Sequence, residues 1–180
     1  MRTIVVVDYD PGWPEAFERV RSRVWPAVRD IASSIEHVGS TAVPGLAAKP
    51  VIDVSVVVPS TTEVPLAIER LARLGYVHRG DFGIEGREAF EGPNVPADHN
   101  LYLCPRDGLG LLNHLAVRDH LRAHPEDVQA YGALKKQLAE RFPHDIDGYV
   151  RGKTEFLITI LRVAGLPPER LAAIERANTP

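Results

Sequence analysis

A disulfide framework, a membrane-spanning run and a basic surface are all missing from this sequence. Cys104 is the only cysteine, so no internal disulfide can form, which is typical of proteins kept in a reducing cytosol. The N-terminal stretch TIVVVDYD meets charge after a short apolar run and lacks the h-region and cleavage site of a signal peptide. No stretch approaches the ~20 apolar residues that cross a bilayer. We therefore expect a cytoplasmic protein without membrane contacts.

The charge of the chain disfavours one class of partner. Its formal net charge is −3 and its pI is about 6.2. A protein that wraps nucleic acid without sequence preference needs a basic surface, so we do not expect nucleic acid as a partner. A local basic pocket for a phosphate group remains compatible with this composition. With 44% hydrophobic and 25% charged residues over 180 positions, the chain can bury the core of a folded domain.

Periodicity in the first part of the chain predicts strands alternating with helices. Apolar, β-branched runs predict strands at 34–40, 49–58, 76–80 and 99–105, and a strand or extended arm at 3–9. One helix is predicted over 13–31 with a kink or break at Pro26. Another runs from a cap at Thr61 or Thr62 to Gly75. A loop too long for a tight hairpin fills residues 81–98.

After Pro105 the pattern becomes helical. Apolar positions at helical spacing predict helices over 111–121, 125–142, 146–161 and 167–177. The 49–58 run is nearly all apolar, so we expect a strand covered on both faces. The expected fold class is α/β: a small mixed β-sheet flanked by helices over residues 1–105, with a helical C-terminal part over 106–180 packed on it in one compact domain.

The main candidate site lies in the stretch HVGSTAVPGLAAKPVIDVSVVV, residues 37–58. A Gly-Ser pair ends the first strand, and glycine there lets backbone amides approach an anion such as phosphate. Gly-Ser alone usually only turns the chain. Asp53, 13 positions after Ser40, sharpens the pattern, because a carboxylate in an apolar strand is costly unless it is paired or binds a metal. Strand alternation places Ser55 on the same face as Asp53.

Four longer segments extend this pattern: YDPGWPEAF, IEHVGSTAVPGLAAKPVIDV, LGYVHRGDFGIEGREAF, and HLAVRDHLRAHPE with the later YGALKKQLAERFP. Together they resemble the GrpB family of the nucleotidyltransferase superfamily, from Tyr9 to about Leu161. The resemblance implies the nucleotidyltransferase fold. It also implies a protein type that occurs alone or fused to dephospho-CoA kinase, with a reaction that is poorly defined for most members.

The resemblance implies a metal-assisted chemistry. In the superfamily, strand carboxylates hold Mg²⁺, which bridges a triphosphate while an acceptor hydroxyl or amine attacks the α-phosphorus. By this likeness Gly39, Ser40 and Thr41 hold phosphate, and Asp53 is the first metal ligand. The second carboxylate is missing, because Ser55 offers only a neutral hydroxyl, a poor ligand for Mg²⁺.

A second departure from the family pattern lies in ADHNLYL. Relatives often carry a histidine-rich strand there. His99 is kept and is a candidate catalytic base, whereas Asn100 and Tyr102 stand at the other histidine positions. Asp98 either replaces the missing metal ligand or is an ordinary loop carboxylate before a strand.

Three cations are candidates for the phosphate site, each with a plain alternative. Lys49, just before the Asp53 strand, either neutralises phosphate or is solvated. Arg87, in a loop long enough to cover a site, forms either a phosphate fork or a surface salt bridge. Lys153, on an otherwise apolar helix face, either snorkels or reaches into the cleft.

The remaining polar positions have simpler interpretations. His37 is either a site residue or part of the turn. Arg118 and Arg122 share a helix face and form either a basic wall towards the sheet or a solvated face. Three histidines lack the convergent spacing of a zinc site and are expected at the surface: His114, His120 and His124.

The first functional hypothesis is an enzyme that transfers a nucleotidyl group, adenylyl from ATP, to a small acceptor with Mg²⁺. Two alternatives stay open. One is an accessory module that binds nucleotide or phosphate without transferring it, and the other is a fold-mate with ligase-like chemistry that uses the same cradle and His99. Ser40 and Asp53 favour the enzyme, whereas Ser55 favours the alternatives.

Overall fold

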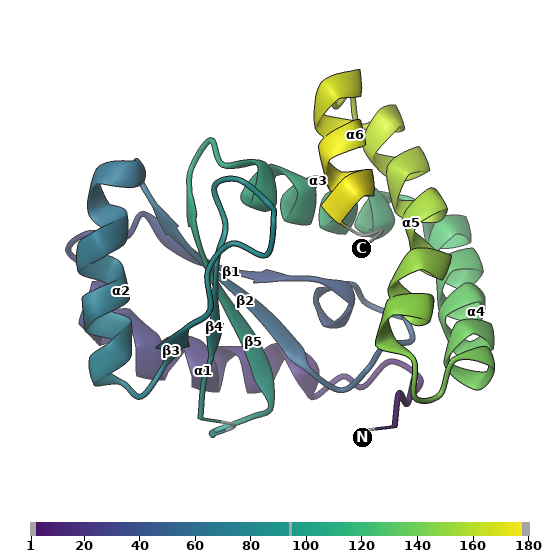
Figure 1. Cartoon of the computed structure of the whole chain (residues 1–180). Helices are drawn as coiled ribbons and strands as arrows, with labels where there is room; N and C mark the ends of the chain where they lie inside the picture. Colours follow the sequence, from purple (N-terminus) through teal and green to yellow (C-terminus); the bar gives the residue numbers. More distant parts are fainter. Residues whose placement is uncertain (1–2, 94, 178–180) are drawn as a thin grey trace.

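The computed structural model describes residues 3–93 and 95–177, which form a sheet with helices on both faces (Figure 1). The strands are β1 (Ser34–Val38), β2 (Ile52–Val58), β3 (Val77–His78), β4 (Glu88–Glu91) and β5 (His99–Pro105). The helices are α1 (Trp13–Val28), α2 (Val64–Arg73), α3 (Leu109–Ala123), α4 (Pro125–Arg141), α5 (Ile146–Val163) and α6 (Pro168–Ala177), with the 3₁₀ turns η1 (Ser40–Ala42) and η2 (Thr61–Glu63). None of these described helices is long and apolar enough to cross a membrane.

The five strands form one mixed sheet in the order β1-β2-β5-β4-β3. β2 and β5 run parallel, and the other neighbouring pairs are antiparallel. In the β1–β2 pair, Val38 lies opposite Asp53, so the turn that follows Val38 comes beside Asp53. The predicted α/β class, a small mixed sheet with flanking helices, is confirmed.

α1 and α2 cover one face of this sheet (Figure 1). The apolar stripe of α1 and the buried face of α2 pack on alternate residues of β2 and β5: Val20, Val24, Val28 and Leu71 against Val54, Val56, Leu101 and Leu103. Burial of these aliphatic side chains is the main stabilising contribution of this layer.

The opposite face of the sheet meets the C-terminal helices. Val57 and Cys104 pack there against Leu111 of α3. The segment after η1 then packs against α3, α4 and α5 through Val43 and Leu46. Because alternation puts Asp53 and Ser55 on the same side of β2 as Val57, the candidate site lies between the sheet and the C-terminal helices.

Several local predictions differ from the structure. Of the two forms expected for the N-terminal stretch, the structure shows the extended arm, with an isolated bridge from Val7 to Ala48. α1 continues through Pro26 to Val28, because a proline in the last turn forfeits only one helical hydrogen bond. Ser60, not Thr61 or Thr62, caps the α2 region, through a reciprocal capping box with Glu63. The predicted loop over 81–98 also contains β4.

The structure places His99 on the face of β5 opposite the candidate site. His99 Nδ1 lies 2.7 Å from the carbonyl oxygen of Ala97, and Nε2 lies 2.7 Å from the Tyr76 hydroxyl. A carbonyl oxygen only accepts, so the ring proton is on Nδ1 and Nε2 accepts from Tyr76. The sequence predicted His99 beside Asp53, but the parity of β5 instead turns Asn100 towards Asp53 and His99 into the α1–α2 layer.

We expect Tyr76→Phe to lower the free energy of unfolding by ~1–3 kcal/mol, because the buried Nε2 of His99 then loses its donor. Urea titration measures this change. Binding of ATP, measured as a thermal shift, should stay at the parent level. A variant of unchanged stability that has lost the ATP shift would instead place His99 in the functional site.

Candidate functional site

The Gly-Ser turn packs directly on Asp53. Gly39 has φ 70° and ψ −169°, a backbone region that is essentially restricted to glycine. A Cβ atom built on Gly39 would overlap the Asp53 carboxylate. The backbone conformation and the close contact with Asp53 each require glycine at position 39. Because Gly39 has no side chain, the turn that carries Ser40 can pack directly against Asp53.

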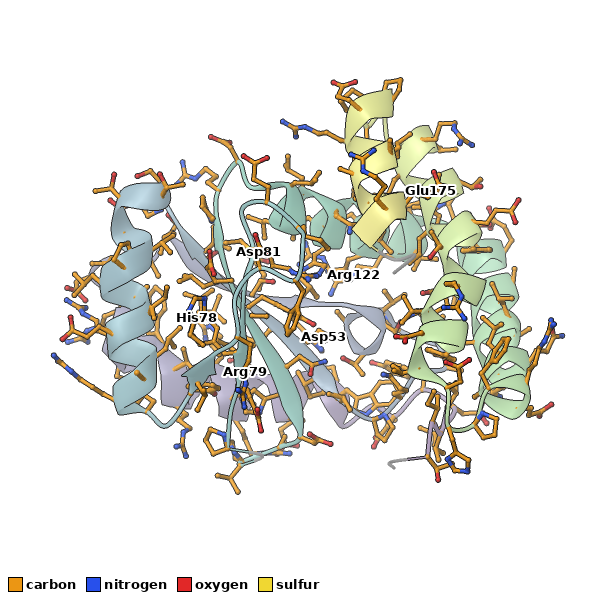
Figure 2. All side chains as sticks on the ribbon, in the orientation of Figure 1. Asp53, His78, Arg79, Asp81, Arg122 and Glu175 are labelled. Atoms are coloured by element: carbon orange, nitrogen blue, oxygen red, sulfur yellow. The ribbon has the colours of Figure 1, made fainter. Side chains whose placement is uncertain are left out.

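Three lysines gather at this turn, and we call Lys49, Lys135 and Lys153 the lysine cluster. Lys135 of α4 is only 2% exposed, and its Nζ donates to the Ser40 hydroxyl oxygen at 2.8 Å. Lys153 of α5 and Lys49 place their Nζ atoms 4.9 Å and 5.7 Å from the ring centre of Tyr149. All three lysines act electrostatically on Asp53. In Figure 2, Asp53 lies in the region between the sheet and the C-terminal helices.

Tyrosine rings support these ammonium groups. The ring centre of Tyr131 lies 4.6 Å from Lys135 Nζ, within range of a cation–π contact. Tyr131 also stacks on Phe156 of α5, with ring centres 4.9 Å apart. The position of Lys135 is therefore fixed by the packing of α4 on α5.

Burial and crowding disfavour the charged forms of these lysines. Burial, with the nearby charges of Lys153 and Lys49, lowers the pKa of Lys135 to about 6. Burial and Lys49 lower the pKa of Lys153 to about 8. Burial also raises the pKa of Asp53, although Asn100 and the lysines oppose this. An anion in the cluster would reverse the shift of the lysines, because it stabilises their protonated forms.

The second carboxylate position of the superfamily is closed. Ser55 is fully buried, and its Oγ lies 3.3 Å from Nδ1 of His114 on α3. Burial and the charge of Arg87 lower the pKa of His114 to about 4, so this imidazole is neutral near pH 7. The expectation that His114 lies at the surface is wrong, because it is partly buried against β2 and β5.

The donor set does not fit a magnesium ion held by the protein alone. Asp53 brings one carboxylate, and its Oδ1 already accepts from Asn100 Nδ2 at 2.9 Å. Within residues 3–93 and 95–177, no group of three or more His, Cys, Asp or Glu side chains converges in a way that could hold a metal. Three lysines beside Asp53 further disfavour a divalent cation, which prefers several anionic oxygens.

Two arginines of α3 fasten the Gly-Ser turn. Arg118 Nη1 donates to the carbonyl of His37 at 3.1 Å and pairs with Glu36 at 3.0 Å. Arg122 donates twice to the carbonyl of Ala42, at 3.0 and 2.7 Å. They share a helix face as predicted, and both tether the turn; Arg118 is partly buried there, whereas Arg122 remains exposed.

The hydroxyl of Thr41 has a structural partner. His37 Nε2 lies 3.0 Å from Thr41 Oγ1, and the His37 ring stacks on Phe17 with centres 4.7 Å apart. Burial and the charges of Arg122 and Arg118 lower the pKa of His37 to about 4. His37 therefore orders the turn, and Ser40 is the residue of this turn whose hydroxyl meets the lysine cluster.

Two further predicted site residues lie beside the lysine cluster and not in it. The Arg87 guanidinium sits 5.3 Å from the ring centre of Tyr102 and donates to the carbonyl of Asp81. Its electrostatic influence falls on His114, at the Ser55 end of the face. Asp98 lines a cavity next to Lys49 and Asn100.

Sequence reasoning missed Lys135. It lies four residues after Tyr131 and three before Leu138, in the apolar stripe of α4, and the same logic that singled out Lys153 would have found it. A lysine at such a position is buried only where a polar group on a neighbouring element accepts its hydrogen bond. That acceptor, the Ser40 hydroxyl, lies 95 residues away in the chain.

Comparison with known proteins agrees with this geometry. The sequence profile of the family described as "GrpB protein" matches residues 3–162. The chain belongs to the GrpB family. The crystal structure of a conserved GrpB protein from Enterococcus faecalis is 37% identical and has a TM-score of 0.79, covering 89% of this chain and 96% of that one. The resemblance predicted from the sequence is confirmed.

Relatives of this GrpB protein differ in length. The glutamate-rich protein GrpB of Alkalihalophilus pseudofirmus is 32% identical over 88% of this chain and 94% of its own. Protein YqkA of Bacillus subtilis is 34% identical, and there the match spans 46% of the relative. A dephospho-CoA kinase of Mycolicibacterium paratuberculosis is 28% identical over 82% of this chain and 42% of its own. The chain thus spans less than half of these last two relatives.

More distant structures share only the fold. The GLD-2/RNP-8 complex contains a chain with 10% identity and a TM-score of 0.56, covering 81% of this chain and 59% of that one. Cid1 in complex with its short product ApU has 12% identity and a TM-score of 0.52, covering 90% and 54%. These likenesses give the GrpB protein a nucleotidyltransferase-like fold.

We expect Gly39→Ala to destabilise the fold and to weaken ligand binding, because its Cβ displaces the Asp53 carboxylate. Gly80→Ala is the matched control: Gly80 also has positive φ, 83°, but a Cβ there meets nothing within 4 Å. Backbone strain alone costs ~1–3 kcal/mol in either variant. Chemical denaturation should show a clearly larger loss for Gly39→Ala, and equal losses would contradict the close contact with Asp53.

We expect Lys135→Met to raise stability near neutral pH by ~1–4 kcal/mol, because it removes a buried ionisable group. The pKa of Lys135 is about 6 in the folded protein against an ordinary 10.5, so between these values the unfolded chain binds an extra proton. Parent stability should therefore rise with pH over this window, and the advantage of Lys135→Met should shrink. Urea unfolding of the parent and of Lys135→Met from pH 6 to pH 10 measures the two free energies of unfolding. A difference between them that does not change with pH would contradict the lowered pKa of Lys135.

Proposed function

We propose that this GrpB protein binds the polyphosphate of a nucleotide at the lysine cluster and transfers the nucleotidyl group, adenylyl from ATP, to a small acceptor. The observation that carries the proposal is the contact of buried Lys135 with the hydroxyl of Ser40. Desolvating a lysine is costly, and its contacts with the Ser40 hydroxyl, the Tyr131 ring and the charge of Asp53 leave the pKa of Lys135 lowered to about 6. A bound polyanion supplies the compensation, which is why we assign the cluster to phosphate.

The residues present divide the chemistry into charge neutralisation and proton transfer. Lys49, Lys135 and Lys153 neutralise the phosphates, and the Ser40 hydroxyl fixes one phosphate oxygen next to the Gly39 backbone. Asp53, whose pKa is raised by burial, accepts the proton of the acceptor group. The acceptor oxygen or nitrogen then bonds to the α-phosphorus, and the bond from this phosphorus to the pyrophosphate oxygen breaks. No step requires a magnesium ion held by the protein.

A second candidate is binding without transfer. Of the two strand carboxylates expected from the superfamily, only Asp53 is present, and its Oδ1 accepts a hydrogen bond from Asn100. Ser55 stands at the second position, and its hydroxyl contacts His114. Such a protein would hold the same nucleotide and release no pyrophosphate. The ligase-like alternative loses its support from His99, because that ring lies in the opposite layer.

The binding half is tested by thermal shift with ATP, GTP, CTP and UTP, with and without Mg²⁺. Lys135→Met should weaken nucleotide binding by ~1.5–3 kcal/mol, about tenfold to a hundredfold in Kd. Lys136→Met is the matched control, because Lys136 is exposed and pairs with Asp8. Equal binding by both variants, or no shift with any nucleotide in the parent, would overturn the assignment.

The transfer half is tested by pyrophosphate release from ATP in the parent and in Asp53→Asn. Asparagine keeps the shape and the contact with Asn100 but cannot accept a proton, so binding should persist while turnover falls. Turnover that is retained by Asp53→Asn would exclude Asp53 as the base. Nucleotide binding without any pyrophosphate release in the parent would establish the non-transferring candidate.

A further inference from the structure

A cavity of about 580 Å³ opens at the end of the sheet where β2 and β5 begin. Its walls come from three parts of the chain: the N-terminal arm at Ile4 and Val5, the entry to β2 at Val51, and the start of α5 at Ile146. Figure 1 shows the arm passing beside the α4–α5 turn at this end of the molecule. A volume of this size is typical of pockets for small molecules.

This cavity shares residues with the candidate site. Lys49 and Asn100 line it. Asn100 Nδ2 donates to Asp53 Oδ1 at 2.9 Å, and Lys49 acts electrostatically on Asp53. A molecule seated in the cavity therefore has one end beside the Asp53 carboxylate and the lysine cluster.

The lining chemistry selects among substrates. Half of the lining residues are aliphatic or proline, and no phenylalanine, tyrosine or tryptophan of the described residues lines the cavity. The walls thus offer no aromatic ring on which a nucleobase would stack, but they suit an aliphatic body. Asn100 and Lys49 lie towards Asp53, where a reacting hydroxyl or amine would need them, whereas Thr3 and His144 line the wall formed by the arm and the α4–α5 turn.

We propose that this cavity holds the acceptor, a small molecule with an aliphatic body that ends in a hydroxyl or an amine. The inference rests on the proposed function. In the reaction the terminal O–H or N–H gives its proton to Asp53, the oxygen or nitrogen bonds to the α-phosphorus of the nucleotide, and pyrophosphate leaves. The aliphatic body stays between the N-terminal arm and α5, so its length decides how much apolar surface is buried.

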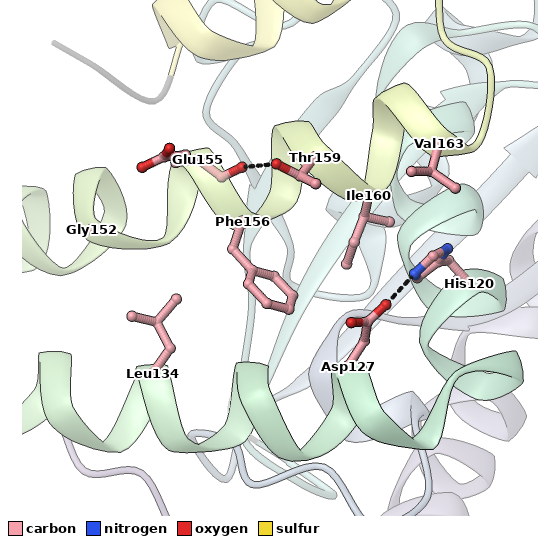
Figure 3. Close-up of a pocket in the computed structure, with 9 residues that line it drawn as sticks. All are labelled: His120, Asp127, Leu134, Gly152, Glu155, Phe156, Thr159, Ile160 and Val163. Atoms are coloured by element: carbon pink, nitrogen blue, oxygen red, sulfur yellow. Dashed lines mark hydrogen bonds and ion pairs between the residues drawn. The ribbon is translucent and has the colours of Figure 1, made fainter.

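A second cavity serves as the comparison site. It measures about 390 Å³ and lies between α3, α4 and α5, lined in part by Leu134, Phe156 and Val163 (Figure 3). At its edge, His120 Nε2 lies 2.6 Å from Oδ2 of Asp127. None of its lining residues belongs to the lysine cluster, so blocking it should leave the reaction unaltered.

The test uses labelled ATP with a series of straight-chain 1-alkanols and 1-alkylamines as acceptors. In the parent, kcat/KM for transfer should rise with chain length, up to about fourfold for each methylene group buried, and level off when the cavity is full. Ile146→Trp narrows the cavity and should move this plateau to shorter chains. Val163→Trp, a change at an exposed aliphatic residue of the same helix, should leave the series unchanged: Ile146 is 49% and Val163 70% exposed.

The same alkanols and alkylamines are also added to the ATP complex, and the further increase in its melting temperature is measured. This measurement reports acceptor binding without turnover. Val5→Trp, on the opposite wall, replaces Ile146→Trp if that variant does not fold. A response independent of chain length, with ATP binding and pyrophosphate release intact, overturns the acceptor cavity and leaves the proposed function standing. A parent that shows no response to ATP overturns both.

Discussion

The contact between Lys135 Nζ and the Ser40 hydroxyl is the constraint on which the site depends. It joins the turn after β1 to a helix that follows some ninety residues later in the chain, and it exists only because α4 packs on both the turn segment and α5. Lys135 Nζ lies over the Tyr131 ring, and this ring stacks on Phe156, so the two aromatic side chains fix the position of the lysine. The C-terminal helices are therefore part of the site and not an appendage of the sheet. Their removal would leave Asp53 with a flat, solvated surface.

The charges around Asp53 are arranged differently from those of a two-carboxylate metal site. A two-carboxylate strand attracts divalent cations, which in turn bind phosphate. Here Ser55 stands in the second position and is covered by His114, while three lysines approach the remaining Asp53. In the proposed function these lysines, and not a metal ion, supply the positive charge that meets the phosphates.

The sequence predicted β1, β2, β3 and β5, the Gly-Ser turn and the family, because these depend on local periodicity and on one contiguous motif; it missed β4, which lies in a segment rich in glycine, proline and charge. It did not predict Lys135, because its burial depends on a contact distant in the chain. It also misassigned His99, because the parity of β5 relative to Asp53 is set by the parallel register with β2, which local pattern does not specify. His114 was placed at the surface for a similar reason: Ser55, its partner, lies on another element.

The N-terminal arm has a practical consequence for handling the protein. The Ile4 amide donates to the carbonyl of Pro143, and Val7 forms a β-bridge with Ala48. The arm thus connects the segment before β2 to the α4–α5 turn. Anything fused ahead of Thr3 emerges at the rim of the cavity there. The first half of α6 instead lines a separate cavity together with Pro59 and Pro105, where β2 and β5 end. An affinity tag or a reporter domain fused ahead of this arm would therefore compete for space with a molecule that enters the cavity.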